Sequence, residues 1–224
     1  MKKSLFIFII LVSTFSIYSQ RKGDFEFGAG IGINYTSSSA TIELLNSNTQ
    51  LQSISILPKA SLNISVSGEY YFSKELGLKS KLIYDSKSWE FKLNNVHYFD
   101  LKLNQITLPI LLNWHFGKHK NWYLNFGPYV DFLINEKEKN INTTLGQQLI
   151  INDSNEEIDS FESFNSFNIG IISGFGYQFY INPKTKLYIE YEGKFGFSEI
   201  AKNDLLDIFS NIRHSFNLGV LFKL

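Results

Sequence analysis

Several polar side chains in this sequence could take part in hydrolysis or acyl transfer. Such chemistry needs a serine nucleophile, a histidine as its general base and a carboxylate that orients the histidine. Asp85 and Ser86 are adjacent, and His214 directly precedes Ser215. Neighbouring residues of a strand point to opposite faces, so His214 and Ser215 cannot cooperate if this segment is a strand. We therefore predict no catalytic residues.

Metal and phosphate sites are weaker candidates. Residues 152–162 (NDSNEEIDSFE) carry the oxygen ligands that calcium prefers, but Ile158 stands where an EF-hand loop needs glycine. A solvated loop explains this segment better, although loose cation binding stays open. Gly28, Gly30 and Gly32 resemble a phosphate-binding loop, but no helical pattern comes after them. The absence of cysteine excludes disulfides and thiolate metal sites. We predict no metal and no cofactor.

The elements that position these residues are predicted to be β-strands. Residues 25–35 alternate with period two, with large apolar side chains on one face and Glu26, three glycines and Asn34 on the other. Seven further segments alternate in the same way: residues 60–72, 76–84, 106–116, 122–132, 167–179, 187–197 and 216–224. A tilted strand needs about 9–11 residues to cross a bilayer. Pro109 cannot donate to the ladder and predicts a bulge.

Charged residues fall on the face opposite the apolar one. The predicted charge network comprises Glu69, Lys79, Lys81, Asp131, Glu190, Glu192 and Lys194. A soluble lipocalin-like barrel, the alternative, would have an apolar interior, whereas a membrane barrel turns its apolar face to lipid. Unpaired buried charges are costly, so these groups should pair across the lumen or contact water. Eight strands enclose an interior that side chains can fill, which favours a packed lumen over a charged pore.

The connections alternate strictly between short and long. Short turns are predicted at residues 73–75, 117–121 and 182–185, and long polar loops at residues 36–59, 86–103, 135–163 and 199–211. Outer-membrane barrels have this asymmetry, with tight periplasmic turns and long extracellular loops. The alternation of faces slips near residues 101–104, so residues 89–103 could extend two strands or add a hairpin. Residues 199–209 are expected to form a short surface helix.

The predicted fold class is therefore all-β, a single antiparallel up-and-down transmembrane barrel. We expect eight strands, with ten as the alternative. In this arrangement His97 lies in an external loop, and His115 and His119 lie at or beside a periplasmic turn. Asp85 and Ser86 lie at the outer end of a strand, and none of these histidines is placed opposite them.

The N-terminus has the order of a secretory signal peptide. Lys2 and Lys3 precede a short apolar run at residues 5–15, and Ser19 offers a small residue for cleavage. The run is too short to span a bilayer as a helix. We predict a signal peptide at residues 1–19 and a barrel domain at residues 20–224. Without Lys2 and Lys3, 19 basic residues face 21 acidic ones, and nothing suggests nucleic acid as a partner.

Two neighbouring strands carry a family resemblance. Residues 106–112 (ITLPILL), a short turn and residues 122–130 (WYLNFGPYV) resemble the PorT-like outer-membrane β-barrel family. Residues 167–179, 187–201 and 213–224 continue this resemblance over essentially the whole mature chain. The chain departs from the pattern at its last residue, because it ends in Leu224 where an aromatic residue is usual. The family's namesake is associated with a secretion and gliding apparatus, but most members have no assigned role.

Together these features predict an integral outer-membrane protein without evident catalysis. It would be a structural or interaction component of the envelope that binds through long extracellular loops or supports a secretion assembly. A narrow channel is the alternative, followed by a barrel enzyme that modifies lipid A. The expected partner is outer-membrane lipid, with other envelope proteins as further candidates, and we expect a monomer.

Overall fold

The computed structural model describes residues 22–36, 40–45, 51–140, 165–197 and 212–224. These ranges contain ten strands: β1 (Phe25–Thr36), β2 (Ala40–Leu45), β3 (Leu51–Lys59), β4 (Ser61–Tyr71), β5 (Leu76–Leu93), β6 (Val96–Phe116), β7 (Trp122–Asn140), β8 (Phe167–Asn182), β9 (Thr185–Gly196) and β10 (Ile212–Lys223). In the same ranges, no helix is long and apolar enough to cross a membrane. The predicted signal peptide, the acidic segment 152–162 and the predicted helix 199–209 lie outside the described residues.

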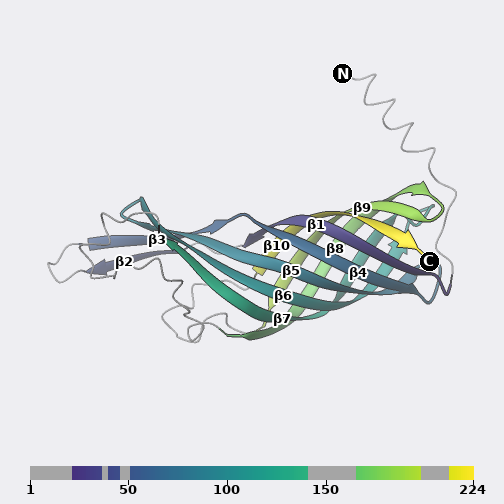
Figure 1. Cartoon of the computed structure of the whole chain (residues 1–224), viewed down its shortest axis with the longest axis horizontal. Helices are drawn as coiled ribbons and strands as arrows, with labels where there is room; N and C mark the ends of the chain where they lie inside the picture. Colours follow the sequence, from purple (N-terminus) through teal and green to yellow (C-terminus); the bar gives the residue numbers. More distant parts are fainter. Residues whose placement is uncertain (1–21, 37–39, 46–50, 141–164, 198–211) are drawn as a thin grey trace, which may run out of the picture.

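Eight of the strands close into an antiparallel barrel (Figure 1). Going round the wall, the order is β5, β4, β1, β10, β9, β8, β7 and β6, and β6 pairs again with β5. The first and last strands pair along their whole length, from Glu26 opposite Lys223 to Thr36 opposite Arg213. The predicted eight-stranded barrel is confirmed, and β2 and β3 lie outside the closed wall.

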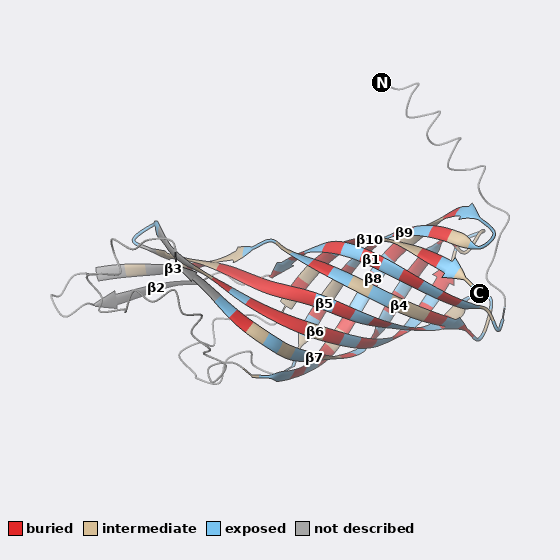
Figure 2. Cartoon of the chain, viewed as in Figure 1, coloured by how far each residue is buried: buried red, intermediate tan, exposed pale blue. Residues whose placement is uncertain are grey.

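The two faces of the wall have opposite character (Figure 2). Along β1 exposed and buried residues alternate without a break. Ile31 is 64% exposed on the outer face, whereas Glu26 is 1% exposed on the inner face. In water this arrangement would be unstable, because it exposes apolar side chains and buries charges. In a bilayer it is the stable arrangement, since lipid surrounds the apolar face.

One side of the barrel rises well beyond the other. Strands β3 and β4 pair one after the other with β5, separated by Ala60, and β2 pairs with β3. Together β2, β3 and the outer parts of β5, β6 and β7 form a projecting sheet, which Figure 1 shows at the end away from the C-terminus. We call this sheet the platform.

The platform corrects the prediction of a long loop at residues 86–103. This segment is mostly strand, and β5 and β6 are joined by Asn94 and Asn95, both with positive φ. Two successive residues with positive φ suit a tight hairpin turn, a conformation that asparagine tolerates. The option that residues 89–103 extend two strands is therefore the correct one. Residues 135–140 also belong to a strand, and β2 and β3 occupy much of the predicted loop 36–59.

A small apolar core holds the platform together. Trp89 is fully buried, and Ile56, Leu101 and Leu103 are at most 3% exposed. Trp89 lies opposite Pro58 on β3 and Leu101 on β6. The inner face thus changes from polar within the barrel to apolar in the platform. This change is expected where strands leave lipid and enter water, because burial of apolar surface is then favourable.

The bulge predicted at Pro109 is absent. Pro109 lies opposite Tyr129, and the pairing with β7 keeps one register on both sides of it. The register shift between these strands falls at Asn104 and Gln105 instead, near the slip seen in the sequence. Proline therefore removes a donor from the ladder here without moving the register.

A closed wall should make the protein heat-modifiable. The barrel has no free edge from which detergent can separate the strands, so unheated and boiled samples should migrate differently on a denaturing gel. Leu218→Arg, on the lipid-facing wall, should lower the conversion temperature, because a charge near the bilayer midplane costs about 2–4 kcal/mol. A detergent-free soluble protein with identical mobility in both samples would contradict the membrane barrel.

Candidate functional site

The lumen contains three tiers of charged and polar groups, of which the first lies near the periplasmic end. Lys186 Nζ lies 2.5 Å from Glu26 Oε1, and the Tyr71 hydroxyl donates to Glu26 Oε2 at 3.1 Å. Glu69 lies directly opposite Glu26 on the neighbouring strand. Its Oε1 lies 3.0 Å from His115 Nε2 and accepts from an asparagine amide at 2.8 Å. Each carboxylate therefore has its own polar partners, which offsets the repulsion between them.

The middle tier crosses the lumen from β5 to β9. Lys79 Nζ lies 3.0 Å from Glu190 Oε2, and Lys81 is ion-paired with Glu190 and, at 2.6 Å, with Glu192. Asn125 donates its amide to Glu190 at 2.8 Å. In the ring of eight strands β5 and β9 lie opposite each other. These pairs therefore span the interior of the barrel, where salt bridges are exposed to little water.

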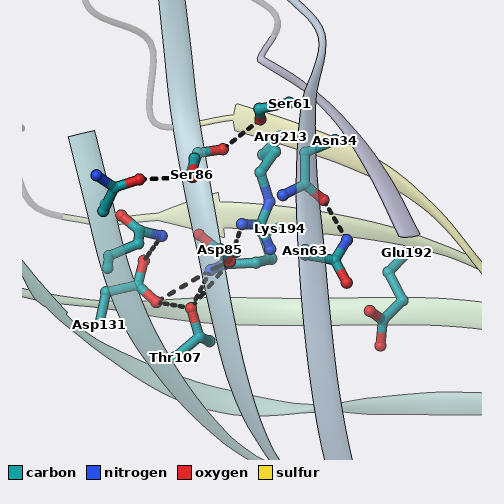
Figure 3. A network of polar contacts seen from close by, with 12 residues as sticks. Asn34, Ser61, Asn63, Asp85, Ser86, Thr107, Asp131, Glu192, Lys194 and Arg213 are labelled. Atoms are coloured by element: carbon teal, nitrogen blue, oxygen red, sulfur yellow. Dashed lines mark hydrogen bonds and ion pairs between the residues drawn. The ribbon is translucent and has the colours of Figure 1, made fainter. Parts of the chain in front are cut away.

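A chain of amides connects the middle tier to β1. Asn217 donates to Glu192 Oε2 at 2.9 Å, and Asn63 donates to the carbonyl oxygens of Asn217 at 3.1 Å and Asn34 at 2.6 Å. Figure 3 shows Asn34, Asn63 and Glu192 beside the third tier. Because an ionised carboxylate accepts hydrogen bonds and cannot donate them, Asn217 must donate to Glu192, and its own carbonyl oxygen is left to accept from Asn63.

The outer tier, drawn in Figure 3, surrounds Asp85. Arg213 Nη1 is ion-paired with Asp85 Oδ2, and Lys194 Nζ lies 3.5 Å from the same oxygen. Lys194 also lies 3.0 Å from Asp131 Oδ1 and donates to Thr107 Oγ1 at 2.8 Å. The described side chains of this tier come from five different strands, so the tier ties the wall together across its width.

The seven residues of the predicted charge network all face the lumen, and none is more than 4% exposed. The structure brings Lys79, Lys81, Glu190 and Glu192 into one cluster and pairs Asp131 with Lys194. The partner of Glu69 at hydrogen-bond distance is His115 and not a lysine.

Four charged members of these tiers were missed in the sequence. Asp85 continues the inward alternation of Lys79 and Lys81, and Glu26 lies on the polar face of the first strand, so both could have been found. Arg213 was missed because the last strand begins at Ile212, four residues before the predicted segment. Lys186 was missed because β9 begins at Thr185, two residues before the predicted segment 187–197.

The candidates for catalysis are not brought together. His214 lies on the outer face, where its Nδ1 is 2.6 Å from the Tyr191 hydroxyl, whereas Ser215 is buried on the inner face. Ser86 donates to an asparagine oxygen at 2.7 Å, and Asp85 is held by Arg213. The predicted opposition of His214 and Ser215 is confirmed. His97 lies in β6 and not in a loop, and His115 is buried in the lumen.

Aromatic side chains and glycines fill the remaining interior. A Cβ added at Gly176 would lie 2.3 Å from the Tyr123 ring, and one at Gly219 would lie 2.5 Å from the Tyr188 ring. Each glycine is the cross-strand partner of its tyrosine on the neighbouring strand, and only glycine leaves room for the ring to lie over that strand. Lys194 Nζ lies 4.5 Å from the centre of the Tyr129 ring, within range of a cation–π contact. An interior cavity beside Asp131 has a volume of about 20 Å³, enough for a water molecule.

A larger hollow, of about 710 Å³, lies on the outer wall and not in the lumen. Its lining includes Ile31, Leu62, Trp122 and Phe216, all exposed on the lipid-facing side. In a bilayer, lipid chains have access to this surface, so the hollow does not mark an enclosed ligand site.

The closed wall, apolar exterior, polar interior and short turns at one end define a transmembrane β-barrel of the outer-membrane class. Residues 18–202 match the family described as outer membrane protein beta-barrel domain, and the chain belongs to this family. It is thus an integral outer-membrane protein whose wall contacts outer-membrane lipid.

Solved structures of other outer-membrane barrels are similar in fold. OprG from Pseudomonas aeruginosa has 14% identity and a TM-score of 0.53, with 92% of this chain and 98% of that chain covered. Ail of Yersinia pestis, solved with the heparin analogue sucrose octasulfate, has 10% identity and a TM-score of 0.46, with 91% and 99% covered. The N-terminal barrel of Pseudomonas aeruginosa OprF has 14% identity and a TM-score of 0.41, with 92% and 100% covered. No curated protein sequence matches the chain. At these identities the OprG likeness shows the fold alone.

Breaking the middle tier should destabilise the barrel. Glu190→Gln leaves the ammonium group of Lys79 buried without its carboxylate, and breaking a buried pair in this way costs about 3–5 kcal/mol. We expect a lower temperature of conversion between the folded and unfolded gel bands. Glu190→Gln/Lys79→Met should recover part of the loss, because it removes both charges. Lys74→Met, at an exposed turn, serves as the control. An unchanged conversion temperature for Glu190→Gln would show that the tier does not support the wall.

Proposed function

We propose that this protein is a sealed, non-catalytic barrel that holds a rigid β-sheet platform outside the outer membrane, through which it interacts with other molecules of the envelope or the medium. The observation that carries this proposal is the continuation of β5 and β6 beyond the closed wall. Together with β2 and β3 they form a sheet with its own apolar core.

Strand pairing, hydrogen bonds and an ion pair hold the platform in one conformation. Residues 87–93 of β5 extend about 23 Å, at about 3.3 Å per residue. The Ser53 backbone N–H donates to the Asn94 side chain at 3.0 Å, and the Asn94 N–H donates to the Ser53 carbonyl at 2.8 Å. Lys59 and Asp100 add an ion pair at 2.5 Å. Ordering these residues costs conformational entropy, and a fixed surface lowers the entropy lost when a partner binds.

The filled lumen supports a sealed barrel and disfavours a channel. Ion pairs span the interior in the middle and outer tiers, and tyrosine rings lie against wall glycines between them. Water and ions would have to displace these groups in order to pass. The proposed role of the seven predicted charged residues is accordingly structural.

The absence of catalysis is also part of this proposal. It is supported by the separation of His214 from Ser215 and by the engagement of Asp85 with Arg213. The similar solved structures are outer-membrane barrels, but they do not assign an activity to this chain.

The strand pair β6 and β7 supports a finer family assignment. We propose membership of the PorT-like branch, on the basis of the ITLPILL and WYLNFGPYV segments of these two strands. We also propose a monomer, with residues 1–19 removed as a signal peptide and residues 20–224 retained as the barrel domain.

The platform can be tested by photo-cross-linking in intact cells. A photoreactive residue at Val96, exposed at the outer end of β6, should form adducts with partner molecules. The same residue at Lys118, in a periplasmic turn, is the matched exposed control. Trp89→Ala should reduce the adducts from position 96, because Trp89 belongs to the platform core. The same variant should leave the heat shift of the barrel unchanged. Adducts at position 96 that are no stronger than those at position 118 would contradict the proposed platform.

The sealed lumen can be tested in planar lipid bilayers. The unmodified protein should show no stepwise ion conductance, because its interior is filled by side chains. Tyr123→Ser/Tyr188→Ser removes the two rings that lie against the lumen glycines and should produce measurable conductance. This variant also shows that the assay detects an opened barrel. Regular conductance steps from the unmodified protein would instead support the channel.

A further inference from the structure

The platform ends in two strand edges, because its strands are not closed into a ring. β2 is the terminal strand of the sheet, and among the strands that the structure describes it pairs with β3 alone. The opposite edge is the outer part of β7, which pairs with β6 from Asn135 to Asn140. A terminal strand presents backbone N–H and C=O groups that its own sheet does not use. The two edges can therefore be compared as sites for a further strand.

The direction of the backbone groups of β2 follows from the hydrogen bonds of β3. The Ser53 N–H donates to the Asn94 side chain at 3.0 Å, and the Ser53 carbonyl accepts from the Asn94 N–H at 2.8 Å. Asn94 directly follows β5, so both backbone groups of Ser53 point to β5 and away from β2. Paired residues of antiparallel strands exchange either two backbone hydrogen bonds or none. Glu43, which lies opposite Ser53, therefore turns its N–H and C=O away from β3.

The alternation of a strand extends this result along β2. Thr41 and Leu45 share the direction of Glu43, whereas the residues between them bond to β3. Pro58 agrees with this assignment, because it lies five residues from Ser53 and its nitrogen therefore points away from β5. The ladder between β3 and β5 thus needs no N–H at the proline. It follows that β2 presents the N–H and C=O groups of three residues at the edge away from β3.

The two edges differ in charge. Residues 136–139 of β7 read EKEK, which is four charged residues in succession. The six residues of β2 read ATIELL, in which Glu43 is the single charged residue. Charged residues, and lysine in particular, protect an edge strand against pairing with another chain. The β7 edge has this protection, whereas the sequence of β2 favours pairing.

An extended polypeptide fits the β2 edge, since its backbone repeats donors and acceptors at the same spacing. A second copy of this chain in the same membrane does not fit. β2 extends from the barrel along its length, close to the direction of the membrane normal (Figure 1). A two-fold axis along that normal would place two parallel β2 strands together, with Glu43 beside Glu43. In a parallel pair, residues that point to the partner lie opposite residues that point away, so this symmetric pair forms no ladder.

We propose that the platform binds its partner by strand addition, in which an extended segment of another protein pairs with the outer edge of β2. The N–H and C=O groups of Thr41, Glu43 and Leu45 would bond to the added strand. Main-chain hydrogen bonds supply affinity in this mode of recognition, and side-chain contacts select the sequence. This inference rests on the proposed function, because it specifies how the platform holds a partner.

A peptide probe can test the edge on the purified full-length barrel in lipid nanodiscs. The probe is a fluorescent peptide of residues 51–59 (LQSISILPK), because this sequence already pairs with the other edge of β2. We expect fluorescence anisotropy to show binding to the unmodified protein. Glu43→Pro should weaken binding about tenfold, because proline removes an outward N–H and its ring obstructs the added strand. Glu43→Ala keeps both backbone groups and should bind as the unmodified protein does.

Glu43→Pro must first retain the heat shift and slow amide exchange at Ile42 and Leu44, which bond to β3. Thr41→Pro replaces it if it does not. Equal binding by the proline and alanine variants would overturn strand addition, as would no binding of the probe, the result expected if a segment of this chain occupies the edge.

Photo-cross-linking at position 96 separates this inference from the proposed function. Adducts that are equally strong in Glu43→Pro and Glu43→Ala would overturn strand addition and leave the platform as the binding surface. Probe binding that is lost in Glu43→Pro, together with an absence of adducts from the unmodified protein, would instead contradict the proposed function alone.

Discussion

Backbone hydrogen bonding within lipid is the constraint on which the rest of this structure depends. No water is available in the hydrocarbon core, so each N–H and C=O group of a crossing strand needs a partner from the same chain. The pairing of β1 with β10 meets this need by joining the two ends of the sheet. Closure then divides the side chains into two populations, because alternate residues of each strand must face either lipid or a narrow lumen.

Closure of the wall also determines the chemistry of the lumen. Side chains that face inward are removed from bulk water whether or not they carry charge, so Lys79 and Glu190 must neutralise each other across the barrel. The packing around them depends equally on small residues. Gly176 and Gly219 allow tyrosine rings to lie against the wall, so the interior is filled without widening the barrel. Charge pairing and packing are therefore two aspects of the same confinement.

The same strands obey a different rule outside the membrane. Along β5 the inward residues change from Lys79 and Lys81 to the buried Trp89, which packs in the platform. Water now surrounds the outer surface, so apolar burial again stabilises the sheet. Between these two regions, the buried side chains of Ser86 and Asn104 are joined by a hydrogen bond. A single hairpin thus crosses lipid and continues into water, with inward side chains suited to each region.

The sequence by itself determined the fold class, the eight crossing strands and the inward face of the charged residues, because alternation with period two is a local property that a strand preserves. It could not determine which charges meet, since Lys81 and Glu192 are brought together only by closure of the ring. It also misjudged residues 86–103, whose two faces are both partly buried once β3 pairs beside β5. Such contacts depend on strand register and on the position of neighbouring hairpins. Both depend on pairing between segments that are distant in the chain, and only the tertiary structure determines that pairing.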